Sequence, residues 1–311
     1  MNKIPVWIDT DCGVDDAFAI LCALKMEELK IVALSSGVGT TKHENTFRNT
    51  RNVLKLAQRE DLKVYPGADE AWIEEYRPAT AFHGENGLGD VIIEESNVPK
   101  ERMHAWDAMY HKAKEMKGEL TIVTIGQLTN VANAIIKYPD FGKYVKQLSI
   151  MGGAVVGGNM TPVAEANIRR DPHAAECVFK SDIPIKMFGL DVTERVYLRA
   201  DELNSLKQNK ITDFIKEAIT IAMKTNRENG YGDNYCIHDL CPLLELVYPE
   251  LFESKRAGVY VETRSEGTMG KTISDLYVLA DHLFEKKNAE VFIEADREKL
   301  SRIIIDLLER Y

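Results

Sequence analysis

The chain of 311 residues is long enough to bury a large core, and its composition, 45% hydrophobic and 28% charged, is that of a globular protein. Its formal net charge of −10, without a block of basic residues, argues against nucleic acids and anionic membrane surfaces as partners. No apolar run is long enough to span a membrane, and no signal peptide is visible. Five scattered cysteines without a CxxC pair predict neither a zinc site nor disulfides, so we expect a cytoplasmic protein.

Short apolar runs alternate with helical patterns along most of the chain. Residues 6–8 predict a first strand, and apolar residues spaced at i, i+3, i+4 and i+7 between Ala17 and Leu24 predict the helix that follows. The later strands predicted in this way lie at 31–34, 62–65, 120–125, 147–151 and 183–188. The later helices predicted lie at 43–57, 130–137, 173–180, 240–247 and 300–308. Irregular polar stretches at 66–97 and 225–237 interrupt the alternation, and long loops of this kind often bind ligands.

This order of elements predicts the fold class. Alternating strands and helices indicate an α/β fold with a mostly parallel central sheet and helices on both faces. No repeat, low-complexity tract or linker divides the chain, so residues 1–311 are expected to form a single domain. Ligands of open parallel sheets bind beyond the carboxyl ends of the strands. The residues that follow predicted strands, among them Asp11, Gly126, Gly152 and Asp191, should therefore surround one crevice.

The loop after the first predicted strand holds four carboxylates within eight residues: Asp9, Asp11, Asp15 and Asp16. Gathering them is costly unless a positive charge compensates, and calcium, which takes about six to eight oxygen ligands, would do so. Gly13 lets the backbone turn so that Asp11 and Asp16 can point toward a common centre. The alternative is a solvated acidic turn that caps the next helix, although a cap needs only a single Asp.

The same loop carries a resemblance that extends along the chain. IDTDCGVDDAFAI, at 8–20, resembles the N-terminal motif DxDPGxDDAxAI of the inosine-uridine-preferring nucleoside hydrolases. Similar motifs follow in the family's order: FHGENGLG at 82–89, IGQLTN at 125–130, MGG…GN…AEAN within 151–167, and IHD at 237–239. The resemblance spans residues 5 to 250 and implies that family's Rossmann-like fold. It also implies calcium-dependent hydrolysis of the N-glycosidic bond of ribonucleosides, in purine or pyrimidine salvage, by a homodimer or homotetramer.

By motif match, the resemblance implies a calcium site and two catalytic residues. The metal ligands would be Asp11, Asp16, Asp239 and the main-chain carbonyl of Ile125, completed by water and two ribose hydroxyls. Asp11 would also be the general base on a water bound to the metal, because a cation lowers the pKa of its water. His238 would protonate the leaving base, since histidine titrates near neutral pH. From the residues alone, His238 could instead be structural, and Asp239 could cap the helix after it.

The ribose-binding residues of the family correspond to Asp15, Asn159, Glu165 and Asn167. Their carboxylates and carboxamides suit sugar hydroxyls, and such a site would reject a 2′-deoxy sugar because a buried partner would lose its hydrogen bond. Considered without the family pattern, Asn159 is more typical of a turn and Glu165 of a surface charge.

Residues near the nucleobase are less clearly assigned. His83 is a weaker candidate there, and Tyr231 and Tyr235 could close over the base or simply anchor their loop. Thr40 stands where the family typically has an Asn beside the scissile bond, and Ala166 where an aromatic residue often lies. These departures leave the metal ligands intact but leave the preferred nucleobase undetermined.

Two other functions are compatible with parts of the sequence. A ribose or nucleoside binder without turnover would keep the metal and ribose residues, and the changes at Thr40 and Ala166 would suit it. A HAD-type phosphatase would use Asp9 as nucleophile and Asp11 as acid, but its second acidic pair belongs on a later strand. We therefore expect an enzyme that acts on a small-molecule ribonucleoside.

Overall fold

The computed structural model describes residues 3–230, 232–276 and 286–311. The prediction for Tyr231 lies outside these described residues. Among them, no helix is both long enough and apolar enough to cross a membrane.

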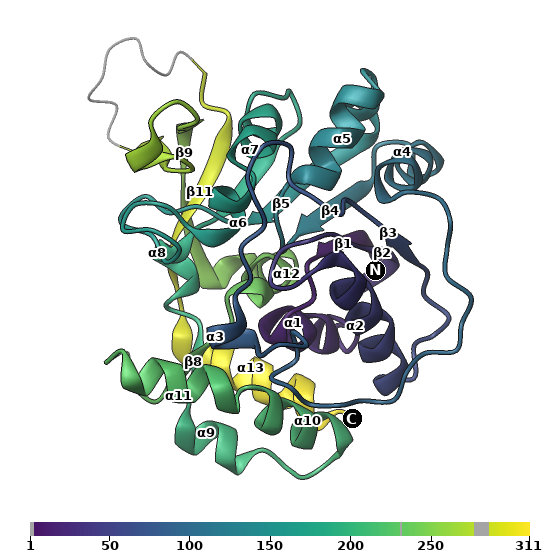
Figure 1. Ribbon diagram of the computed structural model, residues 1–311, viewed down its shortest axis with the longest axis vertical. Coiled ribbons are helices and arrows are strands. Elements are labelled where there is room, and N and C mark those ends of the chain that lie inside the picture. Colours follow the sequence, from purple (N-terminus) through teal and green to yellow (C-terminus); the bar gives the residue numbers. More distant parts are fainter. Residues whose placement is uncertain (1–2, 231, 277–285) are drawn as a thin grey trace.

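The centre of the fold is a nine-stranded sheet with the order β10-β9-β11-β6-β5-β4-β1-β2-β3 (Figure 1). Every neighbouring pair from β3 to β11 is parallel, and β9 is antiparallel to both of its neighbours. The strands are β1 (Ile4–Thr10), β2 (Leu29–Ser36), β3 (Val64–Pro66), β4 (Leu120–Thr124), β5 (Val145–Met151), β6 (Ile185–Phe188), β9 (Phe252–Val261), β10 (Thr272–Asp275) and β11 (Ala289–Ala295). A separate two-stranded antiparallel sheet pairs β7 (Tyr197–Arg199) with β8 (Asn234–Cys236).

Helices cover both faces of the large sheet (Figure 1). Side chains of β1 alternate between two cores, since Val6 and Ile8 pack into one and Trp7 packs into the other. On the face of Val6 lie α1 (Val14–Ala23), α2 (His43–Leu56), α12 (Cys241–Val247) and α13 (Arg297–Glu309). On the face of Trp7 lie α4 (Ala105–Met116), α5 (Thr129–Lys137) and α7 (Pro172–Phe179). The predicted α/β class, with a mostly parallel sheet between two helical layers, is confirmed.

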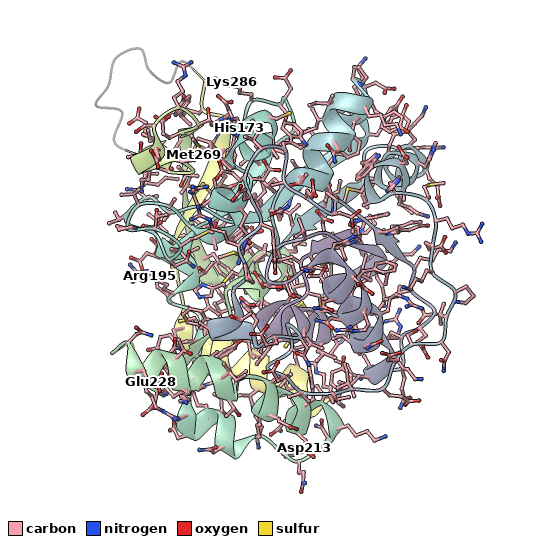
Figure 2. The ribbon with its side chains drawn as sticks, in the orientation of Figure 1. His173, Arg195, Asp213, Glu228, Met269 and Lys286 are labelled. Carbon is pink, nitrogen blue, oxygen red and sulfur yellow. The ribbon has the colours of Figure 1, made fainter. Side chains whose placement is uncertain are left out.

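Six further α-helices lie outside this set in the described part of the chain. They are α3 (Thr80–His83), α6 (Ala166–Arg170), α8 (Leu190–Thr193), α9 (Ala200–Ser205), α10 (Lys210–Ala218) and α11 (Thr220–Glu228). Of these, α9, α10 and α11 are grouped at one end of the molecule (Figure 1). Asp213 and Glu228, labelled in Figure 2, lie at the end formed by α10 and α11, whereas His173 and Lys286 lie toward the opposite end.

The predicted irregular segment at 225–237 is wrong in part. Residues up to Glu228 belong to α11, and Asn234–Cys236 form β8. This end of α11 is mostly exposed, so its polar composition concealed the helix. The segment at 66–97 is irregular as predicted, except for the single turn of α3.

The direction in which the strands are added to the sheet reverses between β1 and β4. The chain builds β1, β2 and β3 outward in one direction and β4, β5 and β6 in the other. Asp9 pairs with Ser35 on one side and with Thr124 on the other, so the loops after β1 and β4 diverge above neighbouring strand ends. Such switch points are where doubly wound sheets bind ligands.

Candidate active site

Asp9, the first carboxylate of the loop, is tied to neighbouring elements of the sheet. Its Oδ1 accepts hydrogen bonds from Ser35 Oγ at 2.5 Å and from Asn130 Nδ2 at 2.9 Å. Burial raises the pKa of Asp9 to about 7, although both hydrogen bonds oppose the shift. Asp9 therefore braces β1 against β2 and α5.

Asp16 organises the turn from β1 into α1. Its Oδ2 accepts a hydrogen bond from the main-chain nitrogen of Gly13 at 2.9 Å, and its Oδ1 accepts one from that of Asp11 at 3.3 Å. The hydroxyl of Thr10 also donates to Oδ1. Burial, followed by the charges of Asp11 and Asp15, raises the pKa of Asp16 well above its usual range. The turn thus holds this carboxylate in place despite an electrostatic cost.

Three carboxylates from distant parts of the chain meet at this turn. Oxygen atoms of Asp15, Asp16 and Asp239 all lie within 4.8 Å of one another, and Asp16 and Asp239 are buried. Burial, then the charges of Asp15, Asp16 and Asp11, raises the pKa of Asp239 well above its usual range, and a hydrogen bond with Asp15 adds to this. Crowded buried carboxylates of this kind are the oxygen donor set of a hard divalent cation. The residues therefore fit a calcium-type ion.

The alternative role of Asp239 as a helix cap is wrong. A 3-10 turn at His238–Leu240 precedes α12, and among the described residues no side chain caps either element. The carboxylate of Asp239 faces Asp15 and Asp16 instead.

Asp11 lies beside this cluster, held from the opposite side by Thr40. The main-chain nitrogen of Thr40 donates to Asp11 Oδ2 at 2.5 Å, and its hydroxyl donates to the Asp11 carbonyl at 2.5 Å. A Cβ added at Gly39 would overlap the Asp11 carboxyl, and one added at Gly126 would lie 2.9 Å from Asp11 Oδ1. Burial raises the pKa of Asp11 to about 6, with Arg170 as the main opposing charge. The segment after β4, which includes Ile125, therefore packs against Asp11. The position of Asp11 leaves no room for a side chain at Gly39 or Gly126.

Two histidines flank Asp15. Nδ1 of His83 accepts a hydrogen bond from the main-chain nitrogen of Val14 at 3.1 Å and lies 3.9 Å from Asp15 Oδ1. Nδ1 of His238 shares a hydrogen bond with Thr193 Oγ1 at 2.8 Å. Burial lowers the pKa of both histidines, and the negative charge of Asp15 opposes that shift in each case. The structure thus brings His83, predicted to lie near the base, to the same carboxylate as His238.

Three of the four predicted ribose residues, Asn159, Glu165 and Asn167, gather around the start of α6. Glu165 is 2% exposed, so the interpretation of it as a surface charge is wrong. Its Oε1 accepts a hydrogen bond from the Asn167 nitrogen at 2.8 Å, and its Oε2 accepts one from Gly153 at 2.8 Å. Asn167 Nδ2 donates to the carbonyls of Ile125 and Met151, each at 3.1 Å. These contacts connect the ends of β4 and β5 to α6.

Asn159 and the aromatic candidates have mixed outcomes. Asn159 is exposed, and its Oδ1 accepts a hydrogen bond from the Ala166 nitrogen at 2.9 Å, next to Glu165. Tyr235 is 5% exposed and stacks on Phe18, so it anchors its loop rather than forming a lid.

Arg170 is a residue of this site that the sequence reasoning missed. Its Nη1 lies 3.9 Å from Asp11 Oδ2, and its side chain is 10% exposed. The only available signal was a pair of arginines, Arg169 and Arg170, directly after the predicted ribose residues. Sequence spacing alone could not predict which of the two arginines turns toward the site. In the structure Arg170 does so, whereas Arg169 pairs with Glu74.

Fold and site together define a class: a Rossmann-like α/β enzyme with an acidic site at the switch point of its sheet. A model of the family described as inosine-uridine preferring nucleoside hydrolase matches residues 6–302. The chain belongs to this family and is a hydrolase of N-glycosyl compounds. This membership argues against the HAD-type phosphatase alternative.

Individual relatives match the chain over nearly its whole length. The pyrimidine-specific ribonucleoside hydrolase RihA of Salmonella enteritidis PT4 is 34% identical over 311 residues, which cover 99% of both chains. The plant nucleoside hydrolase PpNRh1 has a TM-score of 0.95 and 32% identity, over 99% of this chain and 100% of that one. The purine-preferring ribonucleoside hydrolase from Gardnerella vaginalis has a TM-score of 0.91 and 28% identity, over 99% and 100%.

Proposed function

We propose that the chain is a calcium-dependent ribonucleoside hydrolase in which Asp11 is the general base and His238 the general acid. The observation that carries this proposal is the cluster of Asp15, Asp16 and Asp239 carboxylates at the turn after β1, where the main-chain nitrogen of Asp11 donates to Asp16. A carboxylate cluster suits both a hard cation and a sugar on which positive charge develops as the glycosidic bond breaks.

The cation would be held by Asp16, Asp239, Asp11 and the carbonyl of Ile125. When bound, it would lower the pKa of a coordinated water and hold two ribose hydroxyls. The placement of Asp15 within the same cluster allows it either to bind ribose, as we propose, or to join the ligand set. These two roles predict different effects of substitution.

Asp11 would accept the proton of the attacking water. Without a cation, burial raises the pKa of Asp11 to about 6, and a bound cation would lower this pKa and keep the carboxylate ionised to receive a proton. The hydrogen bond from Thr40 holds Oδ2, so the direction in which Asp11 presents its other oxygen is fixed. Such fixed orientation contributes to catalysis because no reorganisation is needed during the reaction.

His238 would donate a proton to the departing base. Thr193 engages Nδ1 and leaves Nε2 available for the leaving group. His83, next to the same Asp15, would line the base side of the site with it. Asp15, Asn159, Glu165 and Asn167 would bind the ribose hydroxyls, and the first carboxylate of the loop, Asp9, would stay structural.

Several finer properties belong to the same proposal. Calcium is the proposed metal because the donor set is entirely oxygen. The family resemblance supports a homodimer or homotetramer that acts in nucleoside salvage, and the scattered cysteines support a cytoplasmic location. The relatives include pyrimidine-specific and purine-preferring enzymes, so their names do not identify the nucleobase that this chain prefers.

A panel of purine, pyrimidine and nicotinamide ribosides, assayed for reducing sugar with calcium and with chelator, tests the proposal. We expect sugar release that requires calcium, that fails with 2′-deoxyribosides and that is lost in Asp11→Asn. Asp213→Asn, which removes an exposed carboxylate of α10, is the matched control. Equal rates with and without chelator would contradict metal dependence.

A further inference from the structure

Arg170 carries a positive charge into the site, and its side chain has no hydrogen-bond partner among the residues that the structure describes. It is the last residue of α6, and its side chain is only 10% exposed. The 3.9 Å between Nη1 and Asp11 Oδ2 is too long for a hydrogen bond, and Nε is buried without a partner among the described residues. A guanidinium has several N–H donors, and burying it with these unsatisfied is costly.

The neighbouring carboxylates are already engaged by the main chain. Asp11 Oδ2 accepts a hydrogen bond from the Thr40 nitrogen at 2.5 Å. Glu165 uses Oε1 for the Asn167 nitrogen and Oε2 for two further main-chain nitrogens. They supply negative charge near Arg170, but the Asp11 oxygen nearest to it, Oδ2, and both oxygens of Glu165 already accept main-chain hydrogen bonds. Because no hydrogen bond engages the guanidinium within the described part of the chain, its donors remain available to an acceptor on a bound molecule.

Arg170 also lies between the two functional sides of the site. Its positive charge opposes the rise that burial causes in the pKa of Asp11, the proposed base, and adds to the effect of burial in lowering the pKa of His83. It acts in the same sense on Tyr76, whose ring is partly exposed. The guanidinium thus lies beside Asp11, the proposed base, and its charge also reaches His83, which we propose to lie near the nucleobase.

Building on the hydrolase function proposed above, we propose that Arg170 binds the leaving group and selects ribosides with an oxygen beside the glycosidic nitrogen. The 2-oxo group of a pyrimidine is such an oxygen, whereas a purine has none next to its N9. Arginine recognises acceptors of this kind through a planar, fixed arrangement of donors.

The chemistry balances without another reactant. The glycosidic C–N bond breaks and its electron pair passes to the base, where it is shared between the ring nitrogen and the adjacent oxygen. A water oxygen bonds to the anomeric carbon, and the water proton passes to Asp11. Arg170 stabilises the negative charge on the departing base until His238 or solvent returns a proton to it.

The test compares kcat/KM for uridine, inosine and 4-nitrophenyl β-D-ribofuranoside, whose phenolate leaves without assistance. In Arg170→Met, we expect the ratio of uridine to nitrophenyl riboside to fall roughly 100-fold, the scale for losing one charge-stabilising donor. The corresponding ratio for inosine should stay within about threefold of the wild-type value, because the loss of one such donor would change it far more. Arg170→Lys should restore part of the uridine ratio. Arg169→Met, the matched control at the neighbouring position, should leave both ratios unchanged.

The possible outcomes separate this inference from the proposed function. An equal loss on all three substrates in Arg170→Met, with a normal melting temperature, would overturn a role toward the leaving group. An unchanged uridine ratio would do the same while leaving the hydrolase function intact. If the wild-type protein released sugar from none of the three, the proposed function would fail and this inference with it.

Discussion

Nδ1 of His238 lies 2.8 Å from the hydroxyl of Thr193, at the end of α8. Thr193 is fully buried, so this contact fixes the imidazole ring from behind. In its proposed role as general acid, His238 would therefore depend on Thr193 as well as on its own pKa.

Replacing Thr193 with Val keeps the shape of the side chain but removes that hydrogen bond. We expect kcat for a natural ribonucleoside to fall about tenfold, less than the loss of about 100-fold or more for His238→Ala. The double variant should be no slower than His238→Ala alone, because Thr193 acts through the histidine. Steady-state kinetics of the three variants measure this. Additive losses would mean that Thr193 contributes by another route.

Calcium titration calorimetry distinguishes the roles of Asp11 and Asp15. Asp16→Asn and Asp239→Asn should weaken calcium binding by about tenfold or more, because each removes a charged ligand. Asp11→Asn should do the same and abolish turnover. Asp15→Asn should keep most of the calcium affinity and raise KM. If Asp15→Asn lost calcium while Asp11→Asn retained it, Asp15 would be the ligand in place of Asp11.

The chelated protein should become less stable as the pH rises from about 5 to 8. Burial raises the pKa of Asp9 to about 7 and that of Asp11 to about 6, so the folded protein holds protons that the unfolded chain releases near pH 4. The stability gained from these protons is present at low pH and lost as pH rises through those two values. Thermal unfolding with chelator and with saturating calcium measures the effect.

Calcium should remove much of this pH dependence, because it would compensate the ionised carboxylates and bind only the folded protein. If the melting temperature fell with rising pH as steeply in saturating calcium as in chelator, the result would contradict binding of a cation at this cluster.

Glu165 should contribute to both stability and substrate binding. It accepts hydrogen bonds from the nitrogens of Gly153, Asn167 and Ile168. Glu165→Ala removes this cap and should cost about 1–2 kcal/mol in the free energy of unfolding. If Glu165 also binds ribose, KM should rise at temperatures where the variant is folded. Glu217→Gln, on the exposed side of α10, is the control. A normal KM would leave Glu165 a purely structural role.

The sequence predicted the part of the site that follows from local pattern. Asp11 and Asp16 lie at the end of an apolar strand and the start of an amphipathic helix, so topology alone brings them to the carboxyl edge. The bounds of α2, predicted at 43–57 and found at His43–Leu56, show how strong that periodicity is. Tertiary packing decided the rest.

Arg170 illustrates what local pattern could not supply. Whether it or Arg169 turns inward depends on the orientation of α6. Glu165 contributes to this orientation by accepting a hydrogen bond from Gly153 in the loop after β5 and others from the first turn of α6. The strand β9 was missed for a similar reason. Its charged residues, such as Glu253 and Lys255, belong to a strand near the sheet edge, where the apolar run is interrupted.

The central claim is that the acidic site hydrolyses the bond between ribose and base. Reaction of the calcium-loaded protein with uridine in ¹⁸O-labelled water, followed by mass spectrometry of the products, tests it most directly. The account predicts free base and ribose in equal amounts, with one labelled oxygen in the ribose and none in the base. Binding of uridine without release of base, or ribose without label, would contradict it.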